Sequence, residues 1–416
     1  MAVVRGGHKQ EENGMKLRPT KRATVAVAAA TTIALGLTGC GEGASGDGSE
    51  SIKVGLVAAL SGPAAAFGGP QNASMAAAVE RINGSGGVKV DGKTYKFEFK
   101  SYDHAYDPTK AVTAANQAIT KDGVSFLQVD GGSIVPAVQP VAEKRDVMVM
   151  ALAGGDQYLG KDHPTTFRLY YDISRSFGAS LSYLKSKDSK VQKVLGIFTD
   201  DEVGRIIAEQ SDGIAKSLGA TPSSVFISRD ATDFAPVLNQ VLPKSPDVIQ
   251  FGGTPPSQYA GIVKTARQRG YKGDFIFPDT VYRPAVVEAA GKEGVEGSVS
   301  SPFFGAFTSE EGKYWTDNIS KHKGGDPSQG WSALAYDNLF LLKAAIEKAG
   351  TLDTKKVSQA MQEVSFDGAV GEVRYGGKDK YGLNQVIEMD FPVAEIQKDG
   401  TLKQVTVVPA AEANRW

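Results

Sequence analysis

The sequence predicts an α/β protein of two lobes, each built on a parallel β-sheet flanked by helices. Two observations support this fold class. From residue 51 onward, short apolar runs alternate with amphipathic segments, which is the pattern of parallel sheets covered by helices on both faces. The same series of strand and helix signals then runs a second time in the latter half of the chain, which indicates two similar lobes.

The first series supplies the elements of one lobe. Strands are expected at 52–60, 96–103, 124–129 and 147–152, where apolar, β-branched and aromatic residues gather. Helices are expected at 71–82, 107–123 and 135–144. The second helix has Asp107 in the capping position and Pro108 at the first helical position, and both are typical of helix starts.

The second series repeats this order. Strands are expected at 193–199, 224–228, 248–252 and 275–278, and helices at 204–218, 233–242 and 258–269. A local likeness supports duplication, because ANQAITKDGVSFLQVDGGS and LNQVLPKSPDVIQFGGT share an Asn-Gln helix, a break and a strand. In both segments that strand ends in two glycines and a hydroxyl residue.

Composition excludes several classes of function. The 416 residues are 41% hydrophobic and 22% charged, which is enough for a large core in two lobes. The segment before Cys40 is basic and the remainder is mildly acidic, so nucleic acid is not an expected partner. No nucleophile elbow or nucleotide-binding glycine pattern occurs, so we expect neither an enzyme nor a cofactor. No metal site is expected, because the histidines of the body are isolated, namely His104, His163 and His322.

The N-terminal segment has the layout of a secretory signal. In MKLRPTKRATVAVAAATTIALGLTGC, a basic stretch precedes an uncharged, apolar-leaning stretch, and small residues precede Cys40. The ending resembles a bacterial lipobox, whose cysteine receives a diacylglycerol. The alternative is a transmembrane anchor, but the stretch is shorter than the roughly 20 apolar residues that a span needs. We therefore expect 1–39 to be a signal peptide with an extension before Met15, and 40–51 to be a lipid-anchored, flexible tether.

Three Gly-Gly turns follow expected strands, within Asp130–Ser133, Ala153–Asp156 and Gly252–Thr254. In an open parallel sheet, ligands bind beyond the carboxyl ends of the strands. Glycine there lets the backbone approach a ligand, and the start of the next helix offers N–H groups to an anion. Each turn taken singly has a simpler explanation as a tight turn. Together they predict one ligand surface to which both lobes contribute.

The stretch IKVGLVAALSGPAAAFGGPQNASMAAAVERINGSGGVKVDG resembles the start of the leucine/isoleucine/valine-binding proteins, and DHAYDPTKAVTAANQAI and VPAVQPVAEKRDVMVMA extend the resemblance. It covers about residues 52–400. It implies the type I periplasmic-binding fold, with two Rossmann-like lobes joined by three crossover segments. It also implies an extracytoplasmic lipoprotein that binds a small polar solute for an ABC importer. The residues that carry it are Leu60-Ser61-Gly62-Pro63, Gly68, Ile82-Asn83, Gly86-Gly87 and Asp107-Pro108.

The resemblance further implies where the chain passes between lobes. The crossings are expected near Arg168–Ser174, Ser300–Phe304 and Gly371–Gly377. Lobe one would hold 52–170 plus 302–373, and lobe two 171–301 plus 374–416. The expected partners are a small-molecule ligand, ABC permease subunits and the membrane through the lipid anchor, and the protein is expected to be a monomer. One alternative stays open, a sensory protein of the same fold that presents its ligand to a membrane receptor.

The family's contacts with the α-carboxylate of an amino acid fall on two of the glycine turns. These loops here supply Asp130, Gly131, Gly132 and Ser133, and Ala153, Gly154 and Gly155. Two positions where the family has hydroxyl side chains appear as Gly131 and Gly155, so the backbone donors would remain while the hydroxyls are missing. Asp130 is a departure that could select a solute with a second cationic or hydroxyl group.

The family's other contacts transfer less completely. The acid that holds the α-ammonium falls on Asp279, although Asp279 also fits a helix cap or turn. An aromatic cover falls on Phe67. The tyrosine of lobe two falls on Val203, so Tyr170, Tyr171 and Tyr282 are expected to supply aromatic walls. Hinge packing is the alternative for Tyr170 and Tyr171. Thr254 completes the candidate set of ligand residues. These departures weaken branched-chain amino acids as the solute.

The first prediction concerns the anchor. Replacement of Cys40 by serine should release the protein into the medium or leave uncleaved precursor, because serine cannot receive the thioether-linked lipid. Mass spectrometry of the mature N-terminus checks this. An unmodified N-terminus at another residue would contradict it.

Overall fold

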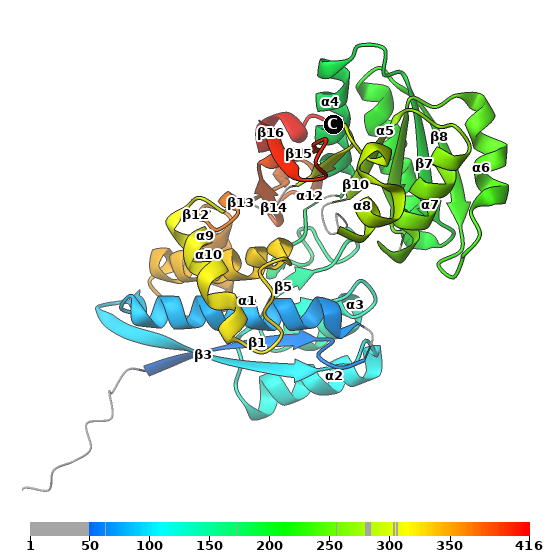
Figure 1. Ribbon diagram of the computed structural model, residues 1–416. Helices are drawn as coiled ribbons and strands as arrows, with labels where there is room; N and C mark the ends of the chain where they lie inside the picture. The colour runs from blue at the N-terminus through cyan, green and yellow to red at the C-terminus, as the bar shows by residue number, and fades with distance from the viewer. Residues whose placement is uncertain are drawn as a thin grey trace, which may run out of the picture. The chain divides into compact units, whose positions relative to one another are not determined.

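The computed structural model describes residues 50–416 except 63, 172, 255, 279–283, 303 and 305–306, and it gives no side-chain description at 202, 256–257 and 284–285. These residues form two β-sheets, of nine and seven strands, with helices on both faces of each (Figure 1). The predicted fold class, two α/β lobes with parallel sheets flanked by helices, is confirmed.

The first sheet has the order β12-β13-β14-β6-β5-β4-β1-β3-β2. Its centre is parallel and consists of β3 (Lys93–Asp103), β1 (Glu50–Ala58), β4 (Phe126–Asp130), β5 (Met148–Leu152) and β6 (Thr166–Arg168). The edges contain antiparallel pairs that the sequence analysis did not predict, formed by β2 (Val88–Val90), β12 (Ser365–Gly368), β13 (Gly371–Gly376) and β14 (Val386–Met389).

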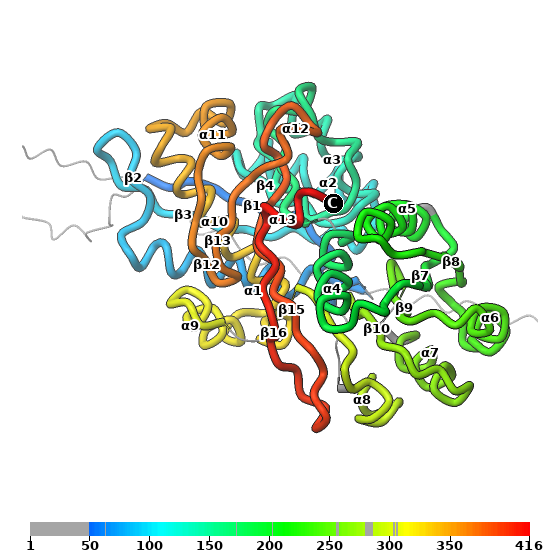
Figure 2. Tube along the Cα trace, turned by 90° about the horizontal axis from the view of Figure 1, so that it is seen from above, coloured from blue at the N-terminus to red at the C-terminus, as the bar shows by residue number. Residues whose placement is uncertain are grey.

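The second sheet has the order β16-β15-β11-β10-β9-β7-β8. Its parallel strands are β8 (Thr221–Ile227), β7 (Lys193–Thr199), β9 (Val248–Gly252), β10 (Asp274–Pro278) and β11 (Val299–Ser301). A C-terminal antiparallel hairpin of β15 (Phe391–Ile396) and β16 (Leu402–Val408) pairs with β11 and extends that side of the sheet (Figure 2).

Helices bury both faces of each sheet. On the first sheet, α1 (Ala65–Gly84), α10 (Ala333–Ala349) and α11 (Thr354–Met361) cover one face, and α2 (Pro108–Asn116) and α3 (Val135–Glu143) cover the other. On the second sheet, α4 (Ile173–Lys187) and α5 (Glu202–Ser217) lie opposite α6 (Ala235–Val241), α7 (Pro256–Gln268) and α8 (Pro284–Ala290). All residues of β4 and β5 are therefore buried, which explains their continuous apolar runs.

The chain changes sheet three times. It leaves the first sheet after β6 and enters α4, which packs on β10 and β11. It returns after β11 through α9 (Glu310–Asn318), which packs on α1. The third change lies between β14 and β15, so the crossing expected at Gly371–Gly377 is wrong. Those residues form β13, because Tyr375 is buried in the first lobe, with its ring 4.9 Å from that of Phe167.

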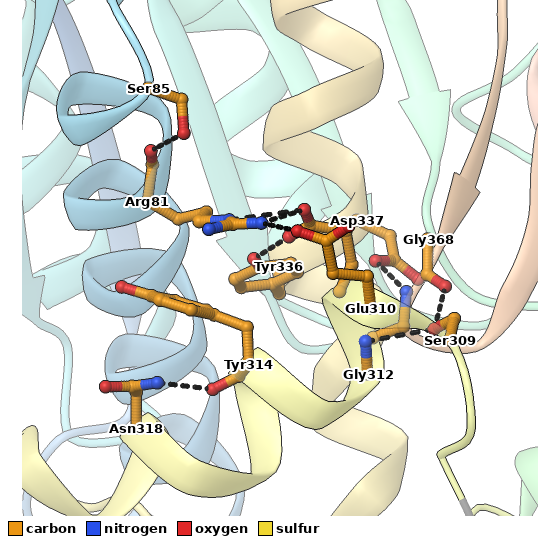
Figure 3. A network of polar contacts seen from close by, with 12 residues as sticks. Arg81, Ser85, Ser309, Glu310, Gly312, Tyr314, Asn318, Tyr336, Asp337 and Gly368 are labelled. Carbon is orange, nitrogen blue, oxygen red and sulfur yellow. Dashed lines mark hydrogen bonds and ion pairs between the residues drawn. The ribbon is translucent and has the colours of Figure 1, made fainter.

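A network of polar contacts fastens the returning segment to α1 (Figure 3). Arg81 of α1 donates to Glu310 at 2.6 Å and to Glu311 at 2.9 Å, both in the first turn of α9. Tyr336 of α10 donates its hydroxyl to the other oxygen of Glu311. The Arg81 guanidinium also lies 4.8 Å from the ring centre of Tyr314. Helix α1 is thus joined around one arginine to α9 and α10, which lie more than 200 residues later in the sequence.

The same network continues through Asp337 to the turn after β12. The fully buried Asp337 carboxylate accepts the backbone N–H groups of Ala369 at 2.7 Å and Val370 at 3.0 Å. Burial raises the pKa of Asp337 to about 7. A Cβ atom on Gly368 would lie 2.3 Å from the Asp337 carboxyl carbon, so only glycine allows this approach. Figure 3 shows Gly368 beside Ser309, whose hydroxyl donates to the Gly368 carbonyl.

The helix after the first strand of each lobe presses against the backbone where that strand ends. A Cβ atom on Gly68 in α1 would lie 2.1 Å from the carbonyl oxygen of Ala59. A Cβ atom on Gly204 in α5 would lie 2.0 Å from the carbonyl oxygen of Thr199. The two lobes therefore use glycine at equivalent places for close helix–strand packing, which agrees with the predicted similarity of the lobes.

We expect Gly68→Ala to destabilise the protein by about 1–3 kcal/mol or more, because the new methyl group meets a backbone atom that cannot move aside. Gly84→Ala in the same helix is the matched control, since nothing lies within 4 Å of its Cβ position. The control should be neutral or stabilising by under about 1 kcal/mol. Urea unfolding of both variants measures the difference, and equal midpoints would contradict the packing argument.

Candidate functional site

The loop after β4 is fixed in an unusual backbone conformation. Gly131 has φ of +111°, and its N–H donates to the carbonyl of Leu152 at the end of β5. Its own carbonyl accepts the N–H groups of Ile134 and Val135 at 3.1 and 3.0 Å, which starts α3. A Cβ atom at Gly131 would lie 2.8 Å from Ile134 Cγ1, so a hydroxyl-bearing side chain does not fit there.

Backbone donors of this loop are free to bind an anion. Gly132 and Ser133 are exposed, and their N–H groups have no acceptor among the residues that the structure describes. The N-cap residue of α3, Ile134, supplies no side-chain cap. Free N–H groups at a helix start carry partial positive charge and bind carboxylates. The sequence predicted this donor set, and the structure places it at the carboxyl end of the central strand β4.

The neighbouring loop, Ala153–Asp156, is fixed by hydrogen bonds from the side chains of Tyr158 and Arg168. The hydroxyl of Tyr158 donates to the carbonyls of Ala153 and Gly154. Arg168 donates to the Gly155 carbonyl at 3.0 Å and to Asp156 at 2.7 Å. Gly154 is exposed, and its N–H has no acceptor within the described part of the chain. The loop therefore presents a second fixed donor beside the first.

Asp156 is the anchor of that loop. Lys380 donates to one of its carboxylate oxygens at 2.7 Å, and Tyr381 donates to the other at 2.6 Å. Burial alone would raise the pKa of Asp156, but these hydrogen bonds and the charge of Arg168 hold it below its ordinary value. Asp156 is thus ionised and fully engaged with protein groups, so its role is to position the loop.

Asp130 differs from Asp156 because the described residues give it no cationic partner. It ends β4, is 8% exposed and lies on the α1 side of the sheet with Gln128. Burial raises its pKa to about 6, and a hydrogen bond from Gln71 only partly opposes this. No lysine or arginine of the described chain contributes to its environment. A buried carboxylate without a counter-charge is a feature of functional sites.

The amide of Gln71 organises the surroundings of Asp130. Gln71 is fully buried in α1, and its oxygen accepts a hydrogen bond from Gln128 at 3.0 Å. Its NH₂ group donates to the Phe67 carbonyl at 3.2 Å and also interacts with Asp130. Gln71 therefore links Asp130 to the first turn of α1, where Phe67 lies.

Large apolar side chains are exposed just beyond the carboxyl ends of strands in both lobes. Phe67 is 53% exposed after β1, and Tyr106 is 55% exposed after β3. In lobe two, Val203 and Ile206 lie in the first turns of α5, after β7, and are 53% and 44% exposed. Exposed apolar side chains beyond strand ends suit contact with the apolar part of a ligand.

The structure assigns an internal role to Thr254. The residue is 4% exposed, and its hydroxyl donates to the Ile197 carbonyl at 3.3 Å. Its own carbonyl accepts the hydroxyl of Tyr259 at 2.7 Å. Both contacts hold the end of β9, so the Thr254 side chain is occupied within the lobe.

Tyr171 lies in the first crossover segment rather than in either loop. Its ring is 2% exposed, stacks on Tyr170 at 5.0 Å and meets Phe391 edge-on at 5.8 Å. Phe391 begins β15, directly after the third crossover. The structure thus favours hinge packing for Tyr171. Asp279, Tyr282 and Cys40 lie outside the described residues.

Sequence reasoning missed Gln71, Gln128 and the contacts of Asp156 with Lys380 and Tyr381. Their signal is weak because each pair is distant in sequence and each residue is of a common polar type. In the described residues, no group of three or more His, Cys, Asp or Glu side chains could hold a metal ion. None of the helices described is long and apolar enough to span a membrane.

Residues 51–401 match the family described as Periplasmic binding protein. The chain is 26% identical over 360 residues to a leucine-, isoleucine-, valine-, threonine- and alanine-binding protein of Pseudomonas aeruginosa, covering 86% of this chain and 92% of the relative. It is 25% identical over 332 residues to a Leu/Ile/Val-binding protein of Escherichia coli, covering 79% of this chain and 88% of the relative.

Solved structures share the fold. The closed form of a leucine-, isoleucine-, valine-, threonine- and alanine-binding protein from Brucella ovis matches with a TM-score of 0.73 and 20% identity, over 88% of this chain and 97% of that one. A Rhodopseudomonas palustris solute-binding protein in complex with 4-hydroxybenzoate matches with a TM-score of 0.67 and 21% identity, over 86% and 97%. The resemblance found in the sequence is confirmed: the chain belongs to the periplasmic binding protein family, whose members bind solutes and are not enzymes.

Proposed function

We propose that this protein is the extracytoplasmic solute receptor of an ABC importer, and that its solute is an amino acid or a related small carboxylate. The observation that carries the proposal is the pair of neighbouring loops after β4 and β5, which present free N–H groups from Gly132, Ser133 and Gly154. Donors fixed in this way bind a carboxylate without a basic side chain.

The exposed apolar residues beyond the strand ends support a solute with an apolar body. Phe67 would cover it from lobe one, and Val203 and Ile206 from lobe two. Asp279 follows β10 in sequence, and an acid there would hold the α-ammonium of an amino acid. Binding would close the two lobes around the solute, because a solute that contacts both loops favours the closed form by its differential affinity.

The relatives' names agree with this solute class. The bacterial relatives are named for leucine, isoleucine, valine, threonine and alanine, and a structural neighbour holds 4-hydroxybenzoate. These compounds share a carboxylate and an apolar or weakly polar body. We extend the proposal to location, with Cys40 lipidated and residues 41–51 as a tether that lets the receptor reach the permease.

The test is a calorimetric screen of the twenty amino acids, and of benzoate and 4-hydroxybenzoate, against the lobes without the signal segment. Binding of at least one amino acid in the micromolar range or tighter supports the proposal. Because a solute that binds only the folded protein raises its stability, thermal unfolding is an independent readout. If only the aromatic acids bind, the carboxylate part of the proposal stands and the α-ammonium part fails.

The Asp279→Asn variant tests the ammonium contact. A charge-assisted hydrogen bond is worth about 1.5–3 kcal/mol, so the variant should bind an amino acid about 10- to 100-fold more weakly. The change is nearly isosteric, so the unfolding midpoint should stay close to that of the parent. Unchanged affinity measured by calorimetry would remove Asp279 from the site.

A ligand-binding role for Asp130 predicts that this acid costs stability while no solute is bound. The pKa of Asp130 is raised from 3.8 to about 6, so the folded protein binds the proton more tightly than the unfolded chain. The resulting loss in the free energy of unfolding is therefore absent below about pH 4, grows between pH 4 and 6 and is complete above pH 6. Its size is about 1.4 kcal/mol for each unit by which the pKa is raised.

Asp130→Asn should accordingly stabilise the solute-free protein by up to about 3 kcal/mol at pH 7.5 and by much less at pH 4.5. Urea unfolding at the two pH values measures this. Asp162→Asn, at an exposed position, is the control for the lost charge and should change neither midpoint. An equal effect of Asp130→Asn at both pH values would show that ionisation of Asp130 is not the cause.

A further inference from the structure

Asp130 occupies a position that is polar, buried and directly joined to the carboxylate-binding loop. It is the residue before Gly131, and its backbone pairs with Leu152 at the end of β5. Its side chain is on the α1 face, whereas the free N–H groups of Gly132 and Ser133 lie on the loop that follows it. A solute held by those N–H groups would therefore be bound next to Asp130, for which the described residues supply no cationic side chain.

The protein partners of Asp130 do not neutralise it. Gln71 offers a neutral amide N–H, and that amide is shared with the carbonyl of Phe67 and with Gln128. His104, in the loop after β3, is the titratable side chain that approaches the backbone of Asp130, and burial lowers its pKa, so it is neutral at pH 7. With a pKa of about 6, Asp130 is ionised at neutral pH.

Gln71, which interacts with Asp130, is also bonded to the backbone of an aromatic residue, Phe67. Phe67 lies one helical turn before Gln71 in α1, and its ring centre is 6.3 Å from that of Trp331. Trp331 is 7% exposed, whereas Phe67 is 53% exposed. Aromatic faces attract cations, and a desolvated carboxylate binds them more strongly still. Together these groups suit an ammonium or a hydroxyl, and they suit a methyl group poorly.

We propose that Asp130 selects the solute by accepting a hydrogen bond from an ammonium or hydroxyl group on its side chain, so that the preferred amino acid is a polar, donor-bearing one rather than an aliphatic one. This inference rests on the proposed function, because it assumes that the loops after β4 and β5 hold the α-carboxylate. The affinity for the solute should follow the strength of the hydrogen bond that its side chain donates to Asp130. An ammonium group should bind most tightly, a hydroxyl group less tightly, and a methyl group, which donates none, least tightly.

Three amino acids of equal size test the order. Norvaline, homoserine and 2,4-diaminobutyrate differ only in a terminal methyl, hydroxyl or ammonium group. Calorimetry at pH 7.5 should show that the parent protein binds 2,4-diaminobutyrate about 10- to 100-fold more tightly than norvaline, with homoserine between them. The pair norleucine and ornithine repeats the comparison with a side chain one carbon longer.

Asp130→Asn is the deciding variant, and Asp162→Asn is the control with the same loss of charge at an exposed position. We expect Asp130→Asn to lose at least tenfold of the preference for 2,4-diaminobutyrate while its affinity for norvaline stays within about threefold. The control should keep the order of the parent. Thermal unfolding of each variant shows that it is folded.

The outcomes separate this inference from the proposed function. If the parent binds norvaline at least as tightly as the other two, or if Asp130→Asn keeps the parent's order, the inference is overturned and the amino-acid receptor remains. If none of the screened carboxylates binds to the parent, the proposed function is overturned and the inference with it. If only the aromatic acids bind, the inference is overturned while the carboxylate part of the proposed function stands. Loss of affinity for all three compounds in Asp130→Asn, with the order unchanged, would make Asp130 a residue that positions the loop and would also overturn the inference.

Discussion

The pairing of β1 with both β3 and β4 is the constraint on which the rest of lobe one depends. The chain runs outward from β1 to β3 on one side and to β4, β5 and β6 on the other. The helix after β1 therefore covers one face of the sheet, and the helices after β3 and β4 cover the opposite face. At such a reversal, the helices diverge and the strand ends are left open to a ligand. The loop of Asp130–Ser133 lies at this point, and Gly68 lets α1 begin directly against the end of β1.

A second constraint comes from the discontinuous path of the chain. The face of the first sheet under α1 is completed only when the chain returns from lobe two and adds α9 and α10. Arg81 joins α1 to Glu310 and Glu311 across about 230 residues, and Asp337 fixes the turn that leads into β13. Because these segments are so distant in sequence, lobe one can complete its packing only after the chain has returned from lobe two. The loop after β5 depends on the same late segment, since Lys380 and Tyr381 hold Asp156.

The sequence was sufficient to predict the alternation of strands and helices, because central parallel strands are buried on both faces and read as short apolar runs. It also located the donor loops, since glycine at strand ends reflects a backbone requirement that leaves a local trace at Gly131. It failed where a role depends on distant partners. Nothing local shows that Tyr375 packs on Phe167, so the third crossing was placed within β13 rather than after β14. Nor does anything local show that the Thr254 hydroxyl donates to the Ile197 carbonyl. Gln71 and Asp130 are 59 positions apart, and only the fold shows that they meet.

The two acids at this edge show how stability and recognition are divided. Asp156 is surrounded by Arg168, Lys380 and Tyr381, so its charge is satisfied and it makes the loop rigid. Asp130 lies one strand away, and among the described residues it receives only a shared amide, so burial raises its pKa while that of Asp156 is lowered. Because the carboxylate donors are backbone N–H groups, and Gly131 leaves no room for a side chain, this loop contributes little discrimination between one α-amino acid and another. Discrimination must then come from side chains beside the loop. Among the described residues there, Asp130 is the acid that has no cationic partner. A solute that donates a hydrogen bond to this carboxylate offsets the free energy lost by burying it, and so binds more tightly than one that does not.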